Sequence, residues 1–141
     1  MGYAAYCGLY CEACCSMITH EKQRGDDSAL QCVTDDKELP CEGCRAQYQQ
    51  NCEFVRCNKA HGTESCALCP EFPCEMLVKF QNDEWEHHQK VLDNLRRIRE
   101  IGVEAWLAEQ KEYWKCPACG FRTQWYQKKC TNCGAAISNY M

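Results

Sequence analysis

The density of cysteine between Cys41 and Cys74 constrains the fold more than any other feature of this sequence. Seven cysteines lie within these 34 residues. Large apolar side chains are few in the same stretch, namely Tyr48, Phe54, Val55, Leu68 and Phe72. Their burial is too small to offset an ordering cost of about 1.5 kcal/mol per residue. Covalent or coordinate bonds must therefore stabilise this part of the chain.

Two Cys-x2-Cys pairs, Cys41/Cys44 and Cys66/Cys69, indicate that these bonds go to a metal ion. Two residues between ligands allow a tight turn to direct both sulfurs at one tetrahedral ion. Disulfides are the alternative to metal binding, and the redox state of the cellular compartment decides between these two possibilities. The N-terminus has neither the basic region nor the apolar run of a secretory signal, and no stretch approaches the roughly 18 apolar residues of a membrane span. We therefore expect a cytoplasmic protein whose reduced thiols bind metal.

The N-terminal residues add Cys7, Cys11 and Cys14, in a Cys-x3-Cys-x2-Cys spacing. The same spacing holds the [4Fe-4S] cluster of radical enzymes, but a barrel that encloses their substrate needs more than 141 residues. We expect these cysteines to belong to a closed structural site. Cys15 is adjacent to Cys14, and neighbouring side chains seldom reach one ion, so Cys15 is set aside. Cys32 is either a distant ligand or a free thiol.

The remaining cysteines before the helical region outnumber the ligands of two four-coordinate sites. They are Cys7, Cys11, Cys14, Cys41, Cys44, Cys52, Cys57, Cys66, Cys69 and Cys74. A third site would need two further ligands, which zinc accepts from histidine as well as from cysteine. The candidates are His20, His61, Cys15 and Cys32. Spacing does not decide which cysteines share a site, and we expect the N-terminal cysteines to join those of the dense array.

Residues 75–113 lack cysteine and show the 3.6-residue period of amphipathic helices. The spacing predicts one helix from an N-cap at Asp83, with Glu86 completing a capping box, to Gly102 as the C′ residue. Its apolar positions are Trp85, Val91, Leu92, Leu95, Ile98 and Ile101. A second helix follows from Val103 and completes a helical hairpin or bent helix. Its apolar stripe is expected to pack against the metal array or a partner.

The last 26 residues carry the most specific signal, two Cys-x2-Cys pairs that are each followed by glycine. The four cysteines are Cys116, Cys119, Cys130 and Cys133, with ten residues between the pairs. This spacing is typical of a zinc ribbon, in which the backbone N–H groups of two turns face the thiolates and a short hairpin crosses between them. Phe121 and the segment TQWYQ supply strand-forming residues for that hairpin. We expect a closed four-cysteine zinc site here.

Charge is distributed unevenly along the chain. Residues 1–114 hold 12 Lys and Arg against 20 Asp and Glu, a balance of −8, whereas residues 115–141 hold four basic residues and no acid. The ribbon thus has an aromatic and basic surface that suits single-stranded nucleic acid or a protein groove; its members are Arg122, Trp125, Tyr126, Lys128 and Lys129. The simpler interpretation is that the lysines offset the charge of a four-thiolate zinc site and that Trp125 covers the ribbon's own core. A second basic cluster has acids close by, which indicates an ordinary charged helix face; it comprises Arg96, Arg97 and Arg99.

These patterns predict a small metal-dominated α+β protein in three parts. Residues 1–80 form a cysteine-rich multi-metal module, residues 81–114 an amphipathic helical segment that packs on it, and residues 115–141 a zinc ribbon. We expect several Zn²⁺ ions per chain, with an Fe-S cluster as the alternative in the N-terminal module. Nothing couples a nucleophile to a base at an interpretable spacing.

The function expected from the residues is therefore that of a non-enzymatic zinc-binding protein. Its four-cysteine sites would be structural, and it would serve as an interaction module for a protein partner or, through the basic ribbon, for nucleic acid. One alternative is an Fe-S electron carrier or redox component, because thiolate-rich sites also suit clusters. Another is a metal storage or delivery protein, whose sites would be exchangeable and partly open.

Several motifs make the chain resemble a microbial family, domain-of-unknown-function family 3795. They are CGLYCEAC from Cys7 to Cys14, CEGCR from Cys41 to Arg45, CEFVRC, CALCPEFPC from Cys66 to Cys74, and the helix NLRRIREIGVEAWLAEQKEYW. The resemblance spans nearly the whole length, since members similar to this chain often append a ribbon. It implies cysteine-rich metal binding and brings no established activity. The family commonly has proline where this chain has Cys15, which agrees with a cysteine that binds no metal.

Overall fold

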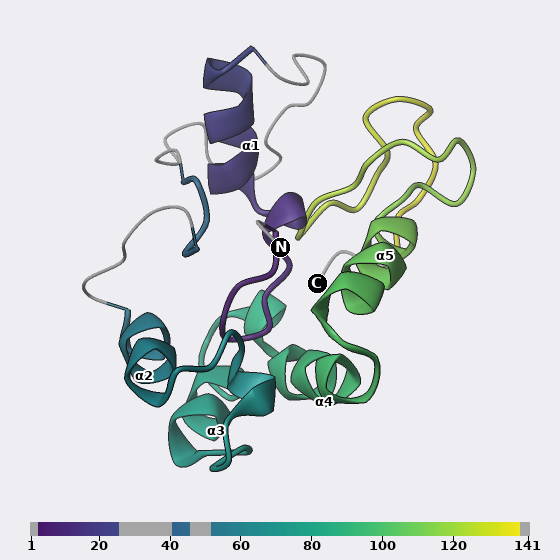
Figure 1. Ribbon diagram of the computed structural model, residues 1–141. Coiled ribbons are helices and arrows are strands. Elements are labelled where there is room, and N and C mark those ends of the chain that lie inside the picture. The colour runs from purple at the N-terminus through teal and green to yellow at the C-terminus, as the bar shows by residue number, and fades with distance from the viewer. Residues whose placement is uncertain (1–2, 26–40, 46–51, 139–141) are drawn as a thin grey trace.

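The computed structural model describes residues 3–25, 41–45 and 52–138, and short helices are the main regular elements of these ranges (Figure 1). The elements are η1 (Cys11–Ala13), α1 (Cys15–Gln23), α2 (Glu53–His61), η2 (Cys66–Leu68), α3 (Glu75–Gln81), η3 (Glu86–His88), α4 (Val91–Ile101) and α5 (Val103–Tyr113). Within these ranges, β pairing is confined to isolated bridges between Ala4 and Tyr10, Lys115 and Arg122, and Lys129 and Ala136. The described chain is therefore mainly helical, with much less strand than the expected α+β fold. None of its helices has the length and hydropathy that crossing a bilayer requires.

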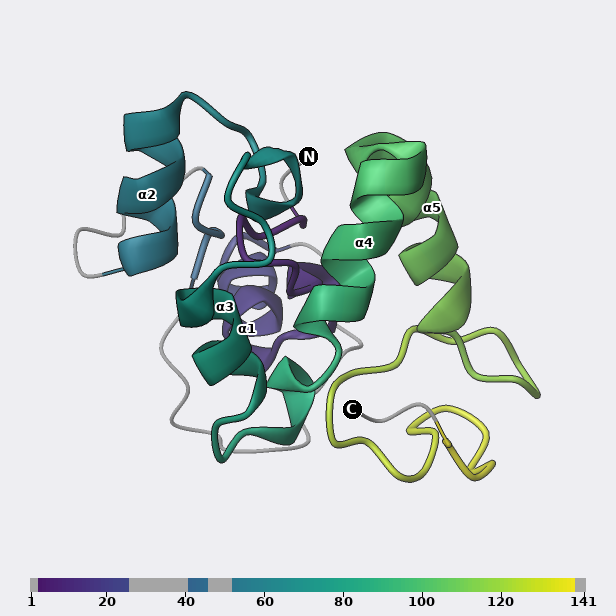
Figure 2. The ribbon, with the colours of Figure 1, turned by 90° about the horizontal axis from the view of Figure 1, so that it is seen from below.

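The main apolar core draws residues from the N-terminal segment and from four of the five α-helices. Its buried members are Ala4, Ala5, Cys7, Tyr10, Ala13, Phe54, Cys66, Ala67, Leu77, Leu92, Leu95, Ile98, Val103, Trp106 and Trp114. The N-terminal segment lies centrally, with α2 and α3 to one side and α4 and α5 to the other (Figure 2). The cysteine-dense stretch thus gains an apolar core from segments outside it, and metal need not supply all of its stability.

The loop that follows Cys7 lies directly against α4. Gly8 has a φ of +92°, and a Cβ atom built there would lie 2.9 Å from Leu95 Cγ and 3.0 Å from the carbonyl oxygen of Val91. The side-chain amide of Asn94 donates a hydrogen bond to the Gly8 carbonyl oxygen at 2.9 Å. Only glycine combines this left-handed backbone with so close an approach. The apolar stripe of α4 therefore packs on the N-terminal segment that carries Cys7.

Helix α4 begins later than the sequence predicts. Asp83 accepts a hydrogen bond from the Trp85 backbone N–H at 2.9 Å and lies 2.7 Å from His88 Nδ1, so it closes a turn before η3 instead of capping α4. Such local bonds compete with helix formation. The helix starts at Val91, and Trp85, which periodicity places in the apolar stripe, is 51% exposed. Gly102 ends α4 as predicted, with a φ of +87°.

Two of the three arginines in the basic cluster on α4 form ion pairs, and the third, Arg99, lies over the Phe72 ring. Arg97 lies 3.0 Å from Glu100 and 2.5 Å from Glu109 on α5, and Arg96 lies 3.2 Å from Asp93. The prediction of an ordinary charged helix face is confirmed. The pair between Arg97 and Glu109 also joins α4 to α5.

The segment TQWYQ forms a docked loop instead of a hairpin strand. Tyr126 has a φ of +65°, a left-handed conformation that a strand does not adopt. The backbone N–H of Trp125 donates to the Ala13 carbonyl oxygen at 3.0 Å, and that of Thr123 donates to the Trp114 carbonyl oxygen at 2.9 Å. The Trp125 ring packs against the main core and not against the small separate core of Cys116, Cys130 and Ile137. Strand propensity was outweighed here by contacts with distant parts of the chain.

Candidate metal centres

The two Cys-x2-Cys-Gly turns near the C-terminus have the same hydrogen bonds. In the first turn, the Cys116 N–H donates to the Phe121 carbonyl oxygen at 2.8 Å, and the Gly120 N–H donates to the Cys116 carbonyl oxygen at 2.9 Å. The Ala118 N–H faces the Cys116 sulfur at 3.4 Å. The second turn, which begins at Cys130, repeats these bonds at 2.8, 3.0 and 3.4 Å. The glycines that end the turns have φ values of +76° and +80°, so the repeated Cys-x2-Cys-Gly motif encodes a repeated local structure.

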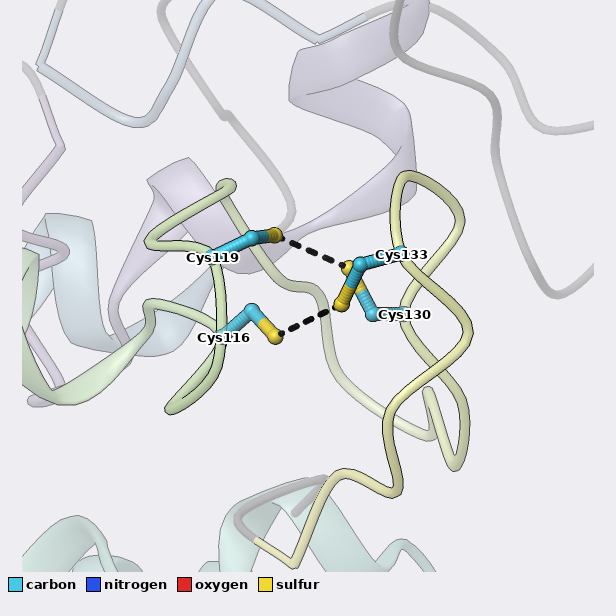
Figure 3. A group of neighbouring side chains, drawn as sticks. All are labelled: Cys116, Cys119, Cys130 and Cys133. Carbon is cyan, nitrogen blue, oxygen red and sulfur yellow. Dashed lines mark hydrogen bonds between the residues drawn. The ribbon is translucent and has the colours of Figure 1, made fainter.

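These two turns face each other and bring four sulfurs together (Figure 3). The Sγ atoms of Cys116 and Cys133 are 3.6 Å apart, those of Cys119 and Cys130 are 3.7 Å apart, and all four lie within 4.8 Å of one another. Sulfurs bound at about 2.3 Å to one tetrahedral zinc ion lie about 3.8 Å apart. The sulfurs of a disulfide lie only about 2.05 Å apart. The geometry therefore suits one metal ion held by four cysteines.

Hydrogen-bond donors around this cluster favour the thiolate form that coordination requires. The side-chain amide of Asn132 and the backbone N–H of Phe121 lower the pKa of Cys119 to about 6. The backbone N–H of Ala135 also favours the thiolate of Cys133, but partial desolvation and hydrogen bonds with the other three sulfurs raise the pKa of Cys133 to about 12. A bound cation would displace that last proton, because only thiolates coordinate.

A second group of cysteines gathers where α2 meets the loop before α3. Cys57 lies on α2, Cys66 begins η2, Cys69 follows η2 directly, and Cys74 is the N-cap of α3. All four line one cavity of about 20 Å³. Burial raises the pKa of Cys66 to about 11, and the other three thiols add to this rise. The structure thus places these four predicted ligands around a common space.

His61 and Glu71 approach the same cavity with exposed side chains. His61 Nδ1 lies 2.8 Å from the Cys57 carbonyl oxygen and 3.6 Å from the Cys57 sulfur, and His61 Nε2 lies 3.5 Å from a Glu71 oxygen. One ligand atom from each of His61, Cys69 and Glu71 lies within 4.8 Å of the others. His61 is therefore within reach of a metal, although both of its ring nitrogens already face other groups.

A third group forms where residues 41–45 lie against the N-terminal segment. The Cys41 N–H donates to the Ser16 carbonyl oxygen at 3.0 Å, and the Gly43 N–H faces the Cys41 sulfur at 3.3 Å, as in the ribbon turns. Arg45 Nε donates to the Ala4 carbonyl oxygen at 2.6 Å. These bonds hold the Cys-x2-Cys turn of Cys41 beside the N-terminal cysteines.

The thiols of this third group are close enough to affect one another. Burial raises the pKa of Cys11 well above its ordinary value, and the neighbouring thiols of Cys44, Cys14, Cys7 and Cys41 add to that rise. Cys52 contributes in the same way to the raised pKa values of Cys7 and Cys44, for which burial is the largest cause. Six cysteines gather here, namely Cys7, Cys11, Cys14, Cys41, Cys44 and Cys52. This number exceeds the four that one closed zinc site needs.

Other predicted ligand candidates have different surroundings. The Cys15 thiol donates to the Gln124 side-chain oxygen at 3.3 Å, and both residues are buried. His20 lies in the last turn of α1, and Cys32 falls outside the described residues. Sequence reasoning missed Asn58, whose amide donates to the Cys66 sulfur at 3.0 Å. No sequence signal singles out Asn58, because the contact depends on how α2 packs against the later loop.

An aromatic cavity of about 350 Å³ lies beside Cys14 and Cys15. The His87 ring stacks on Trp125 with centroids 4.4 Å apart, and His87 Nδ1 lies 2.6 Å from the Tyr126 hydroxyl. The cavity is lined by these side chains and by the exposed ring of Trp85. Of the aromatic and basic surface expected on the ribbon, Trp125 and Tyr126 line this cavity next to η3. The basic residues of that surface do not line it.

Helices around a cysteine-bearing N-terminal segment, together with the four-sulfur cluster, define a cysteine-rich protein with candidate metal-binding sites. The family model described as "Protein of unknown function (DUF3795)" matches residues 3–79, more than half of the chain. The chain belongs to this family. The matched span ends before α4 and the ribbon turns, so it is shorter than the nearly full-length resemblance expected from the motifs. No curated protein and no solved structure matches the chain.

Proposed function

We propose that this chain is a non-enzymatic zinc-binding protein whose four-cysteine sites stabilise the fold and support a docking surface for a protein partner. The observation that carries the proposal is the ribbon cluster, with sulfur separations of 3.6 and 3.7 Å. These separations match the shell of a single tetrahedral ion. In an Fe-S cluster the cysteines are divided among two or more iron atoms, and sulfurs on different irons lie farther apart than the 4.8 Å that encloses all four sulfurs here, which favours zinc over that alternative at this site.

A structural role agrees with the chemistry of the donor set. Four cysteines close a tetrahedral shell and leave no open position for water or substrate, which catalytic zinc sites retain. Binding at such a site supplies on the order of 10 kcal/mol of folding free energy. The paired turns and the burial of Cys116 and Cys130 favour a permanently bound structural ion over an exchangeable ion that the protein stores or delivers.

The state of the thiols supports a reducing compartment. None of the fifteen cysteines of the described ranges forms a disulfide. We place the protein in the cytosol, where thiols stay reduced and closely spaced cysteines are more often metal ligands than disulfides.

Elemental analysis together with an absorption spectrum tests the metal assignment. The anaerobically purified protein is expected to contain zinc and to be colourless, and removal of zinc by a strong chelator should abolish most of the helical circular dichroism signal. Iron with visible charge-transfer absorption would favour the Fe-S alternative. A circular dichroism spectrum that is unchanged after complete metal removal would contradict the structural role.

The partner surface that we propose is the aromatic cavity. Trp85 is 51% exposed at this cavity, and exposed tryptophans of this kind are frequent energetic centres of protein interfaces. A nucleic-acid partner is less well supported, because two of the four basic residues of the ribbon are paired internally. Lys115 lies 2.7 Å from Glu112, and Arg122 lies 2.9 Å from Glu21.

Tryptophan fluorescence with a single-stranded oligonucleotide separates the two kinds of partner. Our proposal expects no quenching at 50 mM salt with micromolar oligonucleotide. Quenching that weakens steeply between 50 and 200 mM salt would instead indicate phosphate contacts and a nucleic-acid partner.

A further inference from the structure

The cavity between α2 and the loop before α3 has the size of a site for one ion. Its volume is about 20 Å³. A cavity needs roughly 10–15 Å³ to hold a single water molecule, so this space has room for one atom or ion of that size. Four cysteines surround it, and they come from three places in the chain: α2, the two ends of η2, and the N-cap of α3.

A buried donor is already directed at one of these sulfurs. Asn58 is 2% exposed, and its side-chain amide donates to the Phe54 carbonyl oxygen at 2.8 Å and to the Cys66 sulfur at 3.0 Å. The Asn58 side-chain oxygen accepts a hydrogen bond from the Thr63 hydroxyl at 2.7 Å, which fixes the orientation of the amide. A fixed N–H donor favours a thiolate over a neutral thiol, as the Asn132 amide does in the ribbon cluster.

Two ligand sets are possible around this space. One consists of the four cysteines, which line the cavity but whose sulfurs do not all lie within 4.8 Å of one another, and the other combines Cys69 with His61 and Glu71, whose ligand atoms do. In the second set both oxygen and nitrogen ligands sit on exposed side chains, and His61 Nδ1 is only 2.8 Å from the Cys57 carbonyl oxygen. The side chains of the four-cysteine set are buried or half-buried. In this set His61 does not bind the ion and stays beside the Cys57 carbonyl oxygen.

We propose that Cys57, Cys66, Cys69 and Cys74 bind a second single zinc ion, which is separate from the ribbon site and holds α2 against the loop before α3. This inference rests on the proposed zinc-binding function and adds the ligand set. On binding, the four thiols lose their protons to solvent and four S–Zn bonds form, which gives a complex of net charge −2. The ion would tie α2, whose last three residues are exposed, to the loop before α3.

Cadmium-113 NMR of the unmodified protein tests the ligand set directly. Cadmium replaces zinc in thiolate sites, and scalar couplings connect each ¹¹³Cd nucleus to the Hβ protons of its own cysteines. We expect one ¹¹³Cd signal coupled to Cys57, Cys66, Cys69 and Cys74, and another coupled to the four ribbon cysteines. Coupling of any of the first four cysteines to a ¹¹³Cd that Cys7 or Cys41 also binds, coupling to the His61 ring, or no coupling at all would overturn the inference. Ribbon couplings in the same spectrum would show that the proposed function survives such a result.

Zinc content of variants provides a second, independent measurement. Cys69→Ser should lose one equivalent of zinc per chain, whereas His61→Ala should lose none. The matched control is Cys15→Ser, the same chemical change at a buried cysteine that is bonded to Gln124. Loss of zinc in His61→Ala, or an unchanged zinc content in Cys69→Ser, would contradict the four-cysteine set.

Discussion

Arg122 and Glu21 form an ion pair, with Nη1 and Oε2 2.9 Å apart, between the C-terminal segment and α1. The side chains are only 18% and 8% exposed. Arg122 Nε also donates to the Glu12 carbonyl oxygen at 3.1 Å, and the Tyr3 hydroxyl donates to Glu21 at 2.6 Å. Arg122, which the sequence placed on an aromatic and basic surface suited to nucleic acid or a protein groove, therefore anchors the loop between the two cysteine turns to the N-terminal part of the chain.

Replacement of Arg122 by methionine should lower the free energy of unfolding by about 3 kcal/mol. The change leaves the buried Glu21 carboxylate without its cation, and removal of one partner from a buried pair is strongly destabilising. Urea unfolding of the zinc-loaded protein, followed by circular dichroism, measures the difference. Lys129→Met is the matched control, because it also removes one positive charge from the same segment but at an exposed position. Equal effects of the two substitutions would show that the ion pair contributes little.

The close approach of Gly8 to α4 predicts a large cost for alanine at this position. Gly8→Ala adds left-handed backbone strain to a clash with the Val91 carbonyl oxygen and the Leu95 side chain, and should destabilise the protein by about 3 kcal/mol. Gly62→Ala serves as the control. Gly62 has a φ of +67° but open space around it, so only the strain of about 1 kcal/mol is expected. Thermal or urea unfolding of both variants checks the difference, and a Gly8→Ala variant as stable as Gly62→Ala would mean that the loop does not press on α4.

Acidification should destabilise the protein through His87. Burial and the neighbouring charge of His88 lower the pKa of His87 to about 4, whereas an unfolded histidine titrates near 6.5. Between these values the unfolded state binds more protons than the folded state, so stability falls as the pH falls from 6.5 towards 4. Because His87 remains partly exposed, we expect a loss of only about 1 kcal/mol between pH 6.5 and pH 5.

The His87→Phe variant isolates this contribution. Phenylalanine can still stack on Trp125 but does not titrate, so the stability difference between the original protein and the variant should shrink as the pH falls. Urea unfolding at several values between pH 6.5 and pH 5 measures this difference, and any effect of acid on the metal sites is common to both proteins. Parallel pH profiles would contradict the role assigned to His87.

A ribbon ligand variant should affect more than the ribbon turns. Cys119→Ser is expected to remove one equivalent of zinc and to change the near-ultraviolet circular dichroism of Trp125, because the loop that carries Trp125 connects the two turns and packs on the main core. The cysteines before α3 should keep their metal, since none of them belongs to this cluster. A zinc content unchanged from that of the original protein would exclude Cys119 as a ligand.

Several local features could be predicted from the sequence because they depend on neighbouring residues. The end of α4 at Gly102 follows from the left-handed conformation that glycine adopts without strain. The ribbon turns follow from two residues between cysteines and a glycine after each pair. The start of α4 was not predicted correctly, because a capping-box spacing at Asp83 also suits the local turn that the chain forms there.

The sequence alone determined that cysteine side chains are the main candidate metal ligands of this protein, since their number and spacing can be counted without knowledge of distant contacts. Only the tertiary structure decided the neighbours of each cysteine. Cys57 and Cys74 line one cavity because α2 packs beside the loop before α3, and Cys15 bonds to Gln124 across 109 positions of sequence. The spacing of cysteines describes the turns that a short segment can form. The contacts between distant cysteines and their neighbours depend instead on the packing of a common core, to which segments far apart in the chain contribute.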